Sequence, residues 1–464
     1  MNRKQTGDLE QPRAFPPSWL FSYGPVAVVT AAFALFAWRF FRLISQYAVN
    51  IFFSDQWAFN DATLFQKHSI WEMFTWQHGP HRQGLGALFA RMVEPQFGWN
   101  SRTESFVVGG VIVAAAICAL YLKKRLYGHI SVFDVVIPAL IFLPAQYETL
   151  FITANFAHGP FPLLLILLYC LAWTCRKSAV RYPLVLVVNF LTIYTGFGLL
   201  LGVLTPFLLV LEYRAGAPEK RLPLPYLAGA MVVALLSLGS FFIGYKFNAD
   251  LSCFSPQPLS PGSYVAYMAL MYANFFALKG VGTLQVIVGG AALIALLASL
   301  ATATRQLVHK QSVDFPSAQR TRSLITVALI AYCLLFCLST AYGRLCGGLW
   351  TARASRYVIY LEVGVLGVYF HLLNLRWASL RRLLLAGLLV AVLGASSYVD
   401  QTDMGYFFNI KLQWKRCYFM NEDIGLCDQM AGFPIYTHAP EGTHLQEKLD
   451  YLKATHQNLY TDAK

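Results

Sequence analysis

Apolar runs of about 15–21 residues recur along this chain of 464 residues, and a helix of that length can cross a hydrocarbon core of about 30 Å. The runs lack the alternation with period two that marks the strands of an outer-membrane barrel. The sequence therefore predicts an all-α polytopic membrane protein with about 11 transmembrane helices. The runs lie near residues 24–44, 105–122, 131–145, 160–174, 183–197, 198–212, 225–245, 282–303, 323–342, 357–374 and 383–397.

Composition and charge agree with this class. The chain is 57% hydrophobic and 13% charged, with a mean hydropathy of +0.50, which excludes an ordinary soluble domain. The net charge of +13 is concentrated in short connections, and such connections face the cytoplasm. We therefore expect a cytoplasmic N-terminus and no nucleic-acid partner. The cation-rich connections are 123–125, 176–181, 214–221, 305–322 and 376–382, and Arg39 and Arg42 are exceptions to the pattern.

The sequence divides into three predicted regions. Residues 1–23 form a polar cytoplasmic segment, and the first run lacks a small-residue cleavage site, so we expect it to remain as an anchor. Residues 24–397 form the transmembrane bundle, including a long outer loop at 45–104. Residues 398–464 form an outer C-terminal region, small enough that we expect it to pack onto the outer loops.

The outer segments carry weaker helical patterns. Apolar residues at helical spacing predict an amphipathic helix over 61–74 on the membrane surface, and a second short helix over 86–93. The apolar stretch 262–278 is too short to span comfortably, so we expect it to be interfacial or re-entrant. Re-entrant backbone normally lines a cavity.

Seven of the nine cysteines fall into two groups. Five lie in or beside apolar runs and are interpreted as packed thiols: Cys118, Cys170, Cys175, Cys333 and Cys337. Cys417 and Cys427 flank a short segment of the outer C-terminal region, where a disulfide can form, so we expect that bridge. A zinc site is not expected there, because a second pair at matching spacing is missing.

The outer loop 45–104 concentrates the polar residues. Asp55, followed by Trp57, lies about ten residues beyond the first run. A carboxylate at a membrane boundary can accept a proton from an acceptor hydroxyl, as a general base does. The alternative is a solvated aspartate or a helix cap, which suits Asp61 better because it directly precedes the predicted amphipathic helix.

A second polar group is the run from His78 to Arg82, in which His81 and Arg82 follow Gly79 and Pro80. Histidines three apart can bind a metal or carry protons, but no carboxylate completes a ligand set in this run, so no metal is predicted. These side chains can donate hydrogen bonds to a phosphate or to sugar hydroxyls. The alternative is contact with lipid head groups.

Three arginines lie between two late runs, on the side expected to be poor in cations. They are Arg344, Arg353 and Arg356, and the last is followed by Tyr357. Arginine binds phosphate oxygens in pairs, which favours a phosphate at the membrane boundary. The alternative is ion pairing with an acidic residue, for which the candidates are Asp55, Glu72 and Glu94.

Two further outer connections contain polar groups. Glu148 and His158 lie in an otherwise apolar connection, so we expect them to face a shared cavity. Residues 194–198 read Tyr-Thr-Gly-Phe-Gly, a tight hairpin whose glycines allow close approach of helices. The hairpin lacks the Lys and Ser/Thr of a phosphate-binding loop.

The arrangement of one span, a long outer loop opening with an aspartate, an interfacial helix and then a bundle resembles the GT-C superfamily of polytopic membrane glycosyltransferases. Smaller patterns carry the likeness to bacterial GT-C-like membrane proteins over most of the chain. Where several relatives have Asn-Glu before the second histidine, this chain has Gly79-Pro80 and lacks that carboxylate. The patterns are Asp55-Gln-Trp, the His-Gly-Pro-His-Arg run, Gln146-Tyr-Glu, Tyr194-Thr-Gly-Phe-Gly and Ala354-Ser-Arg-Tyr.

The resemblance implies transfer of a sugar from a polyprenyl-phosphate donor to a glycan or lipid-linked acceptor on the periplasmic face of a bacterial inner membrane. Asp55 would deprotonate the acceptor for an inverting attack, and the groove under 262–278 would hold the prenyl chain. Neither a metal nor another cofactor is expected, because the phosphate leaving group already carries its charge. Arg344, Arg353 or Arg356 would stabilise that phosphate, and His78, His81 and Arg82 would orient acceptor or phosphate. Trp57, Glu148 and Tyr357 are also expected among the substrate-binding residues.

Three other classes remain as alternatives. A flippase for lipid-linked saccharides would need charged residues deep within spans, and the predicted spans contain almost none. An O-antigen polymerase or ligase would use outer arginines and a lipid-linked donor without depending on an early aspartate. A purely structural assembly subunit would leave the polar clusters unexplained.

Overall fold

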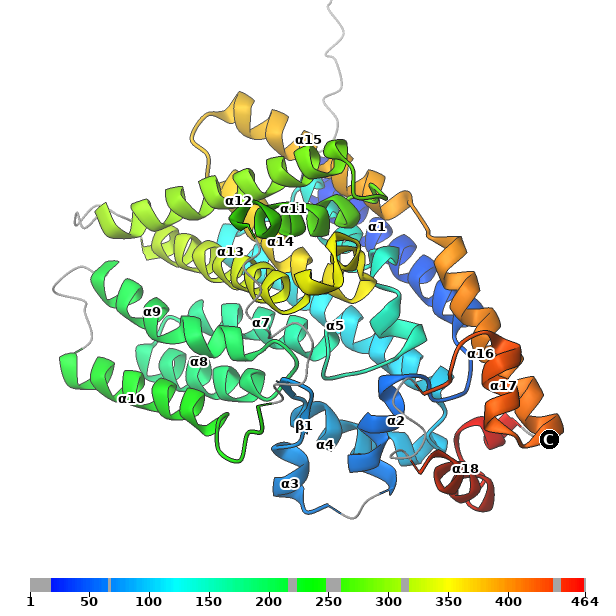
Figure 1. Ribbon diagram of the computed structural model, residues 1–464. Coiled ribbons are helices and arrows are strands. Elements are labelled where there is room, and N and C mark those ends of the chain that lie inside the picture. Colours follow the sequence, from blue (N-terminus) through cyan, green and yellow to red (C-terminus); the bar gives the residue numbers. More distant parts are fainter. Residues whose placement is uncertain are drawn as a thin grey trace, which may run out of the picture.

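The computed structural model describes residues 18–65, 68–215, 223–247, 260–309, 317–436 and 444–462. It is about 80% helical, in agreement with the predicted all-α class. Its long helices form a tilted bundle, and the helices α2 to α4 and α16 to α18 gather along its lower and right-hand edges in Figure 1. The polar residues 1–17 lie outside the described residues.

The main helices range from 6 to 30 residues, and most of them follow the predicted apolar runs. They are α1 (Ser18–Tyr47), α5 (Ser101–Tyr127), α6 (Val136–Ile141), α7 (Pro160–Trp173), α8 (Ser178–Ile193), α9 (Leu199–Ala215), α10 (Leu224–Ser240), α11 (Pro261–Phe275), α12 (Thr283–His309), α13 (Ser317–Arg344), α14 (Val358–Leu373), α15 (Ala378–Ser397) and α16 (Gln401–Asn421). The shorter elements are α2 (Asp55–Asn60), α3 (Ile70–Phe74), β1 (Gln77–His78), β2 (His81–Arg82), α4 (Gly84–Val93), α17 (Ile424–Ala431) and α18 (Leu445–Ala454).

Within the described residues, six helical segments are long and apolar enough to cross a membrane, judged by length and composition. The predicted number of eleven spans is therefore not confirmed. Four further apolar helices are shorter. The 14 residues of α7, for example, rise only about 21 Å, less than the thickness of a hydrocarbon core. The six segments are Tyr23–Tyr47, Ser101–Tyr127, Thr283–Val308, Ser317–Gly347, Ser355–Leu373 and Ala378–Asn421.

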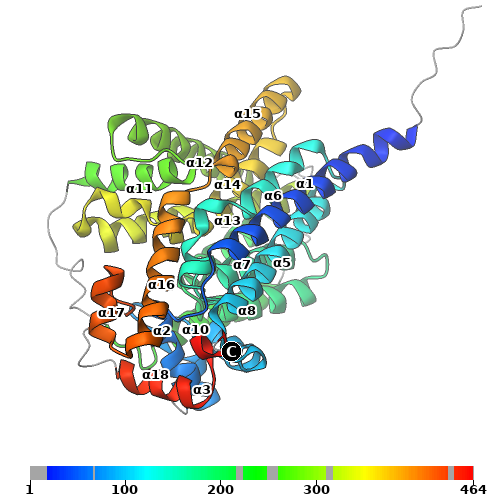
Figure 2. The ribbon, with the colours of Figure 1, turned by 90° about the vertical axis from the view of Figure 1, so that its right-hand side faces the viewer.

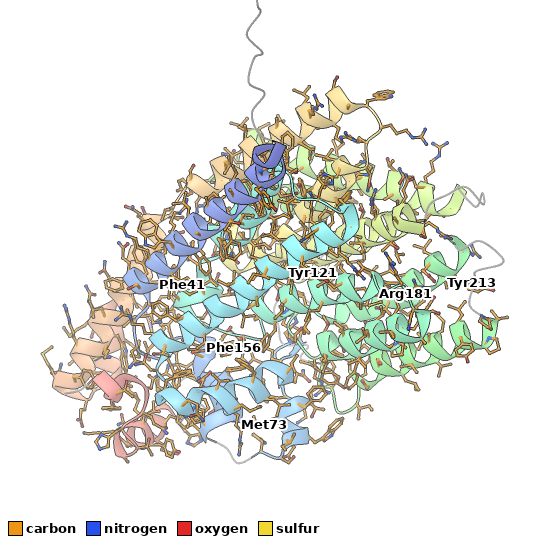
Figure 3. The ribbon with its side chains drawn as sticks, turned by 180° about the vertical axis from the view of Figure 1, so that it is seen from behind. Phe41, Met73, Tyr121, Phe156, Arg181 and Tyr213 are labelled. Atoms are coloured by element: carbon orange, nitrogen blue, oxygen red, sulfur yellow. A yellow bond between two sulfur atoms is a disulfide. The ribbon has the colours of Figure 1, made fainter. Side chains whose placement is uncertain are left out.

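The connections between helices gather at two ends of the bundle. At one end, which we call the basic end, Arg320 donates to the carbonyl of Ala215 at 2.8 Å, and Arg322 donates to the carbonyl of Leu126 at 2.9 Å. Arg181 pairs there with Glu212 at 2.8 Å. In Figure 3, Arg181 lies toward the right-hand edge and Met73 of α3 lies at the bottom, far from it.

The opposite end, which we call the site end, joins the other connections to the C-terminal region. The backbone N–H of Ser54 donates to the carbonyl of Ile435 at 2.8 Å, and Asn458 accepts from the N–H of Phe52 at 3.2 Å. The ion pair of Lys448 with Asp61, at 2.8 Å, ties α18 to the outer loop. Figure 2 shows α16, α17 and α18 lying against the end of the bundle that carries α2 and α3.

The predicted helix over 61–74 is wrong. Residues Asp61–Phe65 form a π-helical turn that continues α2, and α3 starts anew at Ile70. The new start comes from a capping box, in which the Ser69 side chain accepts from the N–H of Glu72 and the Glu72 carboxylate accepts from the N–H of Ser69. The predicted short helix over 86–93 is present as α4.

The stretch expected to be interfacial or re-entrant forms α11, a helix of 15 residues packed against α12. A Cβ atom on Gly289 of α12 would lie 1.7 Å from the carbonyl oxygen of Ala269, so only glycine allows the two helices to approach this closely. An apolar groove of about 370 Å³ lies elsewhere, between α1 and α5, and its walls include Val29, Phe33 and Tyr121.

Candidate functional site

Asp55 is the first residue of α2 at the site end. Its Oδ1 atom lies 3.8 Å from Nε2 of His78, and 55% of its side chain is exposed. The next residue, Gln56, holds the backbone around Asp55 in place. Gln56 is buried and donates to the Glu104 carboxylate at 2.9 Å and to the carbonyl of Ala154 at 3.2 Å. The carboxylate is therefore partly exposed on a fixed backbone, and the region that it shares with His78, His81, His158 and Arg356 is called the recess.

His78 and His81 are register partners in a two-stranded hairpin. The turn between them needs a glycine, because Gly79 has a φ of +55°. The ring of His81 packs 4.4 Å from that of Phe197 and meets the ring of His158 edge-on at 5.5 Å. The hairpin thus places His78 next to Asp55 and His81 next to His158.

The hairpin 194–198 closes this recess from the other side. A Cβ atom on Gly196 would lie 2.8 Å from the hydroxyl oxygen of Tyr360 and 3.0 Å from the carbonyl oxygen of Ala157, so a larger residue would push these segments apart. The close approach lets the Gly196 backbone hydrogen-bond His81. Phe197 then packs against His158 and Tyr360 at 5.5 and 5.1 Å between ring centroids.

Glu148 and Arg356 connect two distant segments. Arg356 Nη1 lies 2.6 Å from Glu148 Oε1, and the Arg356 N–H donates to the same carboxylate at 3.3 Å. Ser355 strengthens this junction, because its hydroxyl accepts from the N–H of Glu148 at 3.1 Å and donates to the carbonyl of Ala145 at 2.6 Å. The predicted partners Asp55, Glu72 and Glu94 do not form this ion pair.

The protonation states follow from the surroundings. Burial acts to raise the pKa of Asp55, but the hydrogen bond and charge of His78, with the charges of Arg356 and His158, outweigh it and lower the pKa to about 2. Burial lowers the pKa of His158 to about 4, assisted by the charge of Arg356. Burial, with the charges of His158 and Arg344, holds the pKa of His81 well below its ordinary value. At neutral pH the site holds an ionised Asp55 beside two neutral histidines.

The segment between α13 and α14, residues 344–357, is called the arginine loop. Its other predicted residues lie around this recess. Arg344 ends α13, is exposed, and acts electrostatically on His81. The Arg353 carbonyl accepts from the side chain of Asn274 at 3.0 Å, and both residues line a small pocket that also includes Ser355. Tyr357 is buried, with the guanidinium of Arg356 over its ring at 5.6 Å.

Two predicted binding residues have structural roles instead. Arg82 is buried, and its guanidinium donates to three backbone carbonyls, those of Phe241 at 3.2 Å, Ile243 at 2.5 Å and Thr75. It therefore joins the hairpin to the end of α10 and has no free face for a phosphate. Trp57 is fully buried, with its ring edge-on to Phe52, so it does not line the recess.

Asp61 and the outer cysteines also have structural roles. Asp61 pairs with Lys448 rather than entering the recess. Cys417 and Cys427 form a disulfide with 5.5 Å between their Cα atoms. Cys346, which the sequence interpretation left out, is disulfide-bonded as well and lies in the arginine loop. The Cys417–Cys427 disulfide and the disulfide-bonded Cys346 therefore both lie at the site end.

Sequence reasoning missed a buried network under Asp55. It consists of Gln56, Glu94, Glu104 and Lys411, each no more than 3% exposed. Lys411 of α16 donates to the carbonyl of Ile152 at 2.9 Å and interacts electrostatically with Glu104. Burial, together with the charge of Glu104, raises the pKa of Glu94 well above its ordinary value. The only sequence signal was a pair of glutamates at the start of an apolar run.

The spans also hold more ionisable groups than expected. Glu362 lies within the span Ser355–Leu373, is 1% exposed, and neither of its carboxylate oxygens has a hydrogen-bond partner among the described residues. Lys123 and Asp134 form a buried ion pair at 2.7 Å toward the basic end. The statement that the spans contain almost no charged residue is therefore wrong, because these residues sit singly inside strongly apolar runs.

Neither a metal-binding group nor a comparison with known proteins identifies the function of this site. Within the described ranges, no group of three His, Cys, Asp or Glu side chains is placed to hold a metal ion. No family model, no curated protein and no solved structure matches this chain.

Proposed function

We propose that this protein is an inverting glycosyltransferase that moves a sugar from a polyprenyl-phosphate donor to a glycan or lipid acceptor. The observation that carries the proposal is the ionised and accessible Asp55, held 3.8 Å from His78 and in the field of Arg356 at one end of an apolar helical bundle. The sequence resemblance to GT-C glycosyltransferases supports it independently.

In this proposal Asp55 accepts the proton of the acceptor hydroxyl while the hydroxyl oxygen attacks the anomeric carbon. The bond from that carbon to the phosphate oxygen breaks, and the polyprenyl phosphate leaves with the electron pair. A pKa of about 2 makes Asp55 a weak base in the empty site. A donor phosphate beside the arginines offsets their positive charge, so binding of the donor raises the basicity of Asp55 when it is needed.

The three arginines then have different roles. Arg356 is engaged by Glu148, so it positions the recess and tunes Asp55. Arg344 is exposed, and no ion pair is recorded for it among the described residues, so it is the group that meets the phosphate and stabilises its growing charge. The neutral imidazoles of His81 and His158 each have one N–H, which a backbone group already occupies, so the second ring nitrogen of each can accept a hydrogen bond from a sugar hydroxyl.

The proposed site faces the periplasm of a bacterial inner membrane, with the N-terminus in the cytoplasm. Cations gather at the basic end, as expected for a cytoplasmic face, and the disulfide positions Cys346 and Cys417 lie at the site end, as expected for an oxidising compartment. The prenyl chain and surrounding lipid lie against the apolar helices. The charged leaving group makes a metal unnecessary in this scheme.

The test compares purified wild type with Asp55→Asn and Asp61→Asn in lipid nanodiscs. The donors are polyprenyl-phosphate hexoses labelled with carbon-14, and native membranes supply the acceptors. We expect wild type to transfer label, Asp55→Asn to lose about 10²–10⁴-fold in rate, and Asp61→Asn to stay near wild type, since Asp61 contacts Lys448 instead. Normal transfer by a folded Asp55→Asn variant would remove Asp55 as the base. No transfer by wild type from any donor would reject the function.

One observation favours a second candidate, a flippase for lipid-linked saccharides. Glu362 is an isolated carboxyl buried within a span, and ionisable residues in such places mark transport pathways. A flippase would lose movement of a fluorescent lipid-linked saccharide across proteoliposomes in the Glu362→Gln variant. A glycosyltransferase would keep its transfer rate in that variant, so the two functions separate.

A further inference from the structure

A small pocket lies beside the Asp55 recess, between the end of α11, the turn at residues 144–147, the arginine loop and the start of α16. Its enclosed part holds about one water-sized group. Ser355 lines it and also bonds Glu148, so the pocket and the recess share a wall. Its lining also includes Asn274, Arg353, Lys279, Asp400, Tyr147 and Tyr398.

Among the residues that line this pocket, two polar side-chain atoms are buried and lack a hydrogen-bond partner within the described residues. They are Oδ1 of Asn274 and Nε of Arg353. Asn274 is only 5% exposed, and its amide nitrogen is already used on the Arg353 carbonyl at 3.0 Å, which fixes the free oxygen. A buried acceptor and a buried donor left unpaired each cost free energy unless a ligand satisfies them.

The remaining charges of the pocket are balanced. Lys279 pairs with Asp400 and lies 3.9 Å from Asp403, so it does not provide a free cation. The hydroxyl of Tyr147 donates to Asp403 at 2.9 Å. Tyr398 is 41% exposed and contributes an aromatic face at the mouth. A balanced polar pocket with an aromatic rim suits a neutral group better than a phosphate.

A hydroxyl is the group that matches both unpaired atoms, because it can donate to Oδ1 of Asn274 and accept from Nε of Arg353 at once. We propose that this pocket binds one ring hydroxyl of the saccharide substrate and thereby selects the sugar. This inference rests on the proposed function and adds to it a specificity-determining pair, Asn274 and Arg353, which line the pocket together with Ser355.

The experiment measures how strongly the protein discriminates against deoxy sugars. Full-length protein in nanodiscs is tested with free hexoses and their monodeoxy analogues, by competition in saturation-transfer NMR, and with the matching polyprenyl-phosphate donors in transfer. We expect one monodeoxy analogue to bind about 10- to 100-fold more weakly than its parent in wild type. Asn274→Leu should remove that difference in affinity, because leucine cannot accept the hydrogen bond and fills the space that the hydroxyl would occupy.

Asn274→Asp serves as the second variant if the leucine variant does not fold. An aspartate keeps the size of the side chain but replaces the amide donor by an oxygen that faces the Arg353 carbonyl, so the acceptor oxygen is no longer held in place and the discrimination again falls. Asp55→Asn is the matched control, because it should abolish transfer and leave discrimination intact. Equal binding of all analogues in wild type, or unchanged discrimination in both Asn274 variants, would mean that the pocket holds only an ordered water and would overturn the proposal.

The outcomes separate this proposal from the proposed function. Discrimination that depends on Asn274 without any transfer by wild type would keep the hydroxyl pocket and reject the glycosyltransferase. Transfer that depends on Asp55, with discrimination independent of Asn274, would keep the glycosyltransferase and reject the pocket.

Discussion

Arg356 and Glu148, 208 residues apart in the chain, meet as an ion pair of 2.6 Å at the edge of the Asp55 recess. Their side chains are 36% and 22% exposed, so the pair is partly shielded from water. It fixes the segment that leads to His158 against the loop that precedes α14. The Arg356 guanidinium also lowers the pKa of Asp55, so the same residue affects both the stability of the site and the charge of Asp55.

The first prediction concerns this pair. Glu148→Gln and Arg356→Gln should each lower the free energy of unfolding by about 1–3 kcal/mol, and the double variant should lose less than their sum. Unfolding in mixed detergent micelles gives the coupling energy. The pair of Arg181 and Glu212 at the basic end, 19% and 25% exposed, is a matched control that should couple similarly without affecting transfer. Additive losses at Glu148 and Arg356 would contradict the prediction.

The second prediction separates two arginines that the sequence groups with the same site. Arg82→Met should lower the free energy of unfolding by about 2–4 kcal/mol, because three backbone carbonyls lose their donor. Arg344→Met should leave stability within about 0.5 kcal/mol, because its side chain is exposed, and should reduce transfer. Thermal unfolding and transfer measured on both variants check the prediction, and equal stability of the two would contradict it.

The third prediction is a pH dependence of stability from His158. Its pKa is about 4 in the folded protein and about 6.5 when unfolded, so between these values the unfolded state binds more protons. Stability should be complete above pH 6.5 and decrease as the pH falls to 4. His158→Gln should flatten this slope, whereas His129→Gln, an exposed histidine toward the basic end, should not. The slope is measured by unfolding at fixed detergent between pH 4 and 7.5.

The fourth prediction concerns Asp55 in acid. Its pKa is lowered to about 2 from about 3.8, so its contribution to stability is present above pH 3.8 and is lost as the pH falls toward 2. A pKa shift of this size corresponds to about 2.5 kcal/mol in the free energy of unfolding. Because the carboxylate is exposed to solvent, we expect a contribution of about 1 kcal/mol. Asp55→Asn should therefore be less stable than wild type at pH 6 and equal to it near pH 2. A constant difference over this range would contradict the assignment.

The sequence predicted local features of the site better than long-range pairings. The bridge of Cys417 to Cys427 was predicted and is present, and it joins residues only 10 apart in the chain. The partner of Glu148 could not be predicted, since nothing in the local pattern selects Arg356 over nearer arginines. The burial of Trp57 and the use of Arg82 on carbonyls depend on how α10 and Phe52 pack, which periodicity does not encode.

Short elements and isolated charges were the other source of error. A continuous helical pattern over 61–74 was overridden by the capping box at Ser69, which begins a new helix. Glu362 was overlooked because a single carboxyl barely changes the hydropathy of a long apolar run. The predicted number of eleven spans is not confirmed, because some apolar runs form helices, such as α7, that are short for a membrane span.

The last prediction concerns Glu94, which lies under the recess with 0% exposure and has no hydrogen-bond partner for either oxygen among the described residues. Burial, with the charge of Glu104, raises its pKa well above 4.5, so the folded protein keeps it protonated while the unfolded chain ionises it. Its stability contribution is complete below the unfolded pKa and is lost as the pH rises through the folded pKa.

Glu94→Gln should therefore raise the free energy of unfolding at pH 8 by about 1–3 kcal/mol and have little effect near pH 4, because glutamine copies the neutral form without the cost of ionisation. Glu447→Gln in α18, where the side chain is 77% exposed, is the matched control and should have no comparable effect at either pH. Unfolding of the three proteins at both pH values checks this. A Glu94→Gln variant less stable than wild type at pH 8 would show that the carboxylate is ionised and paired in the folded protein.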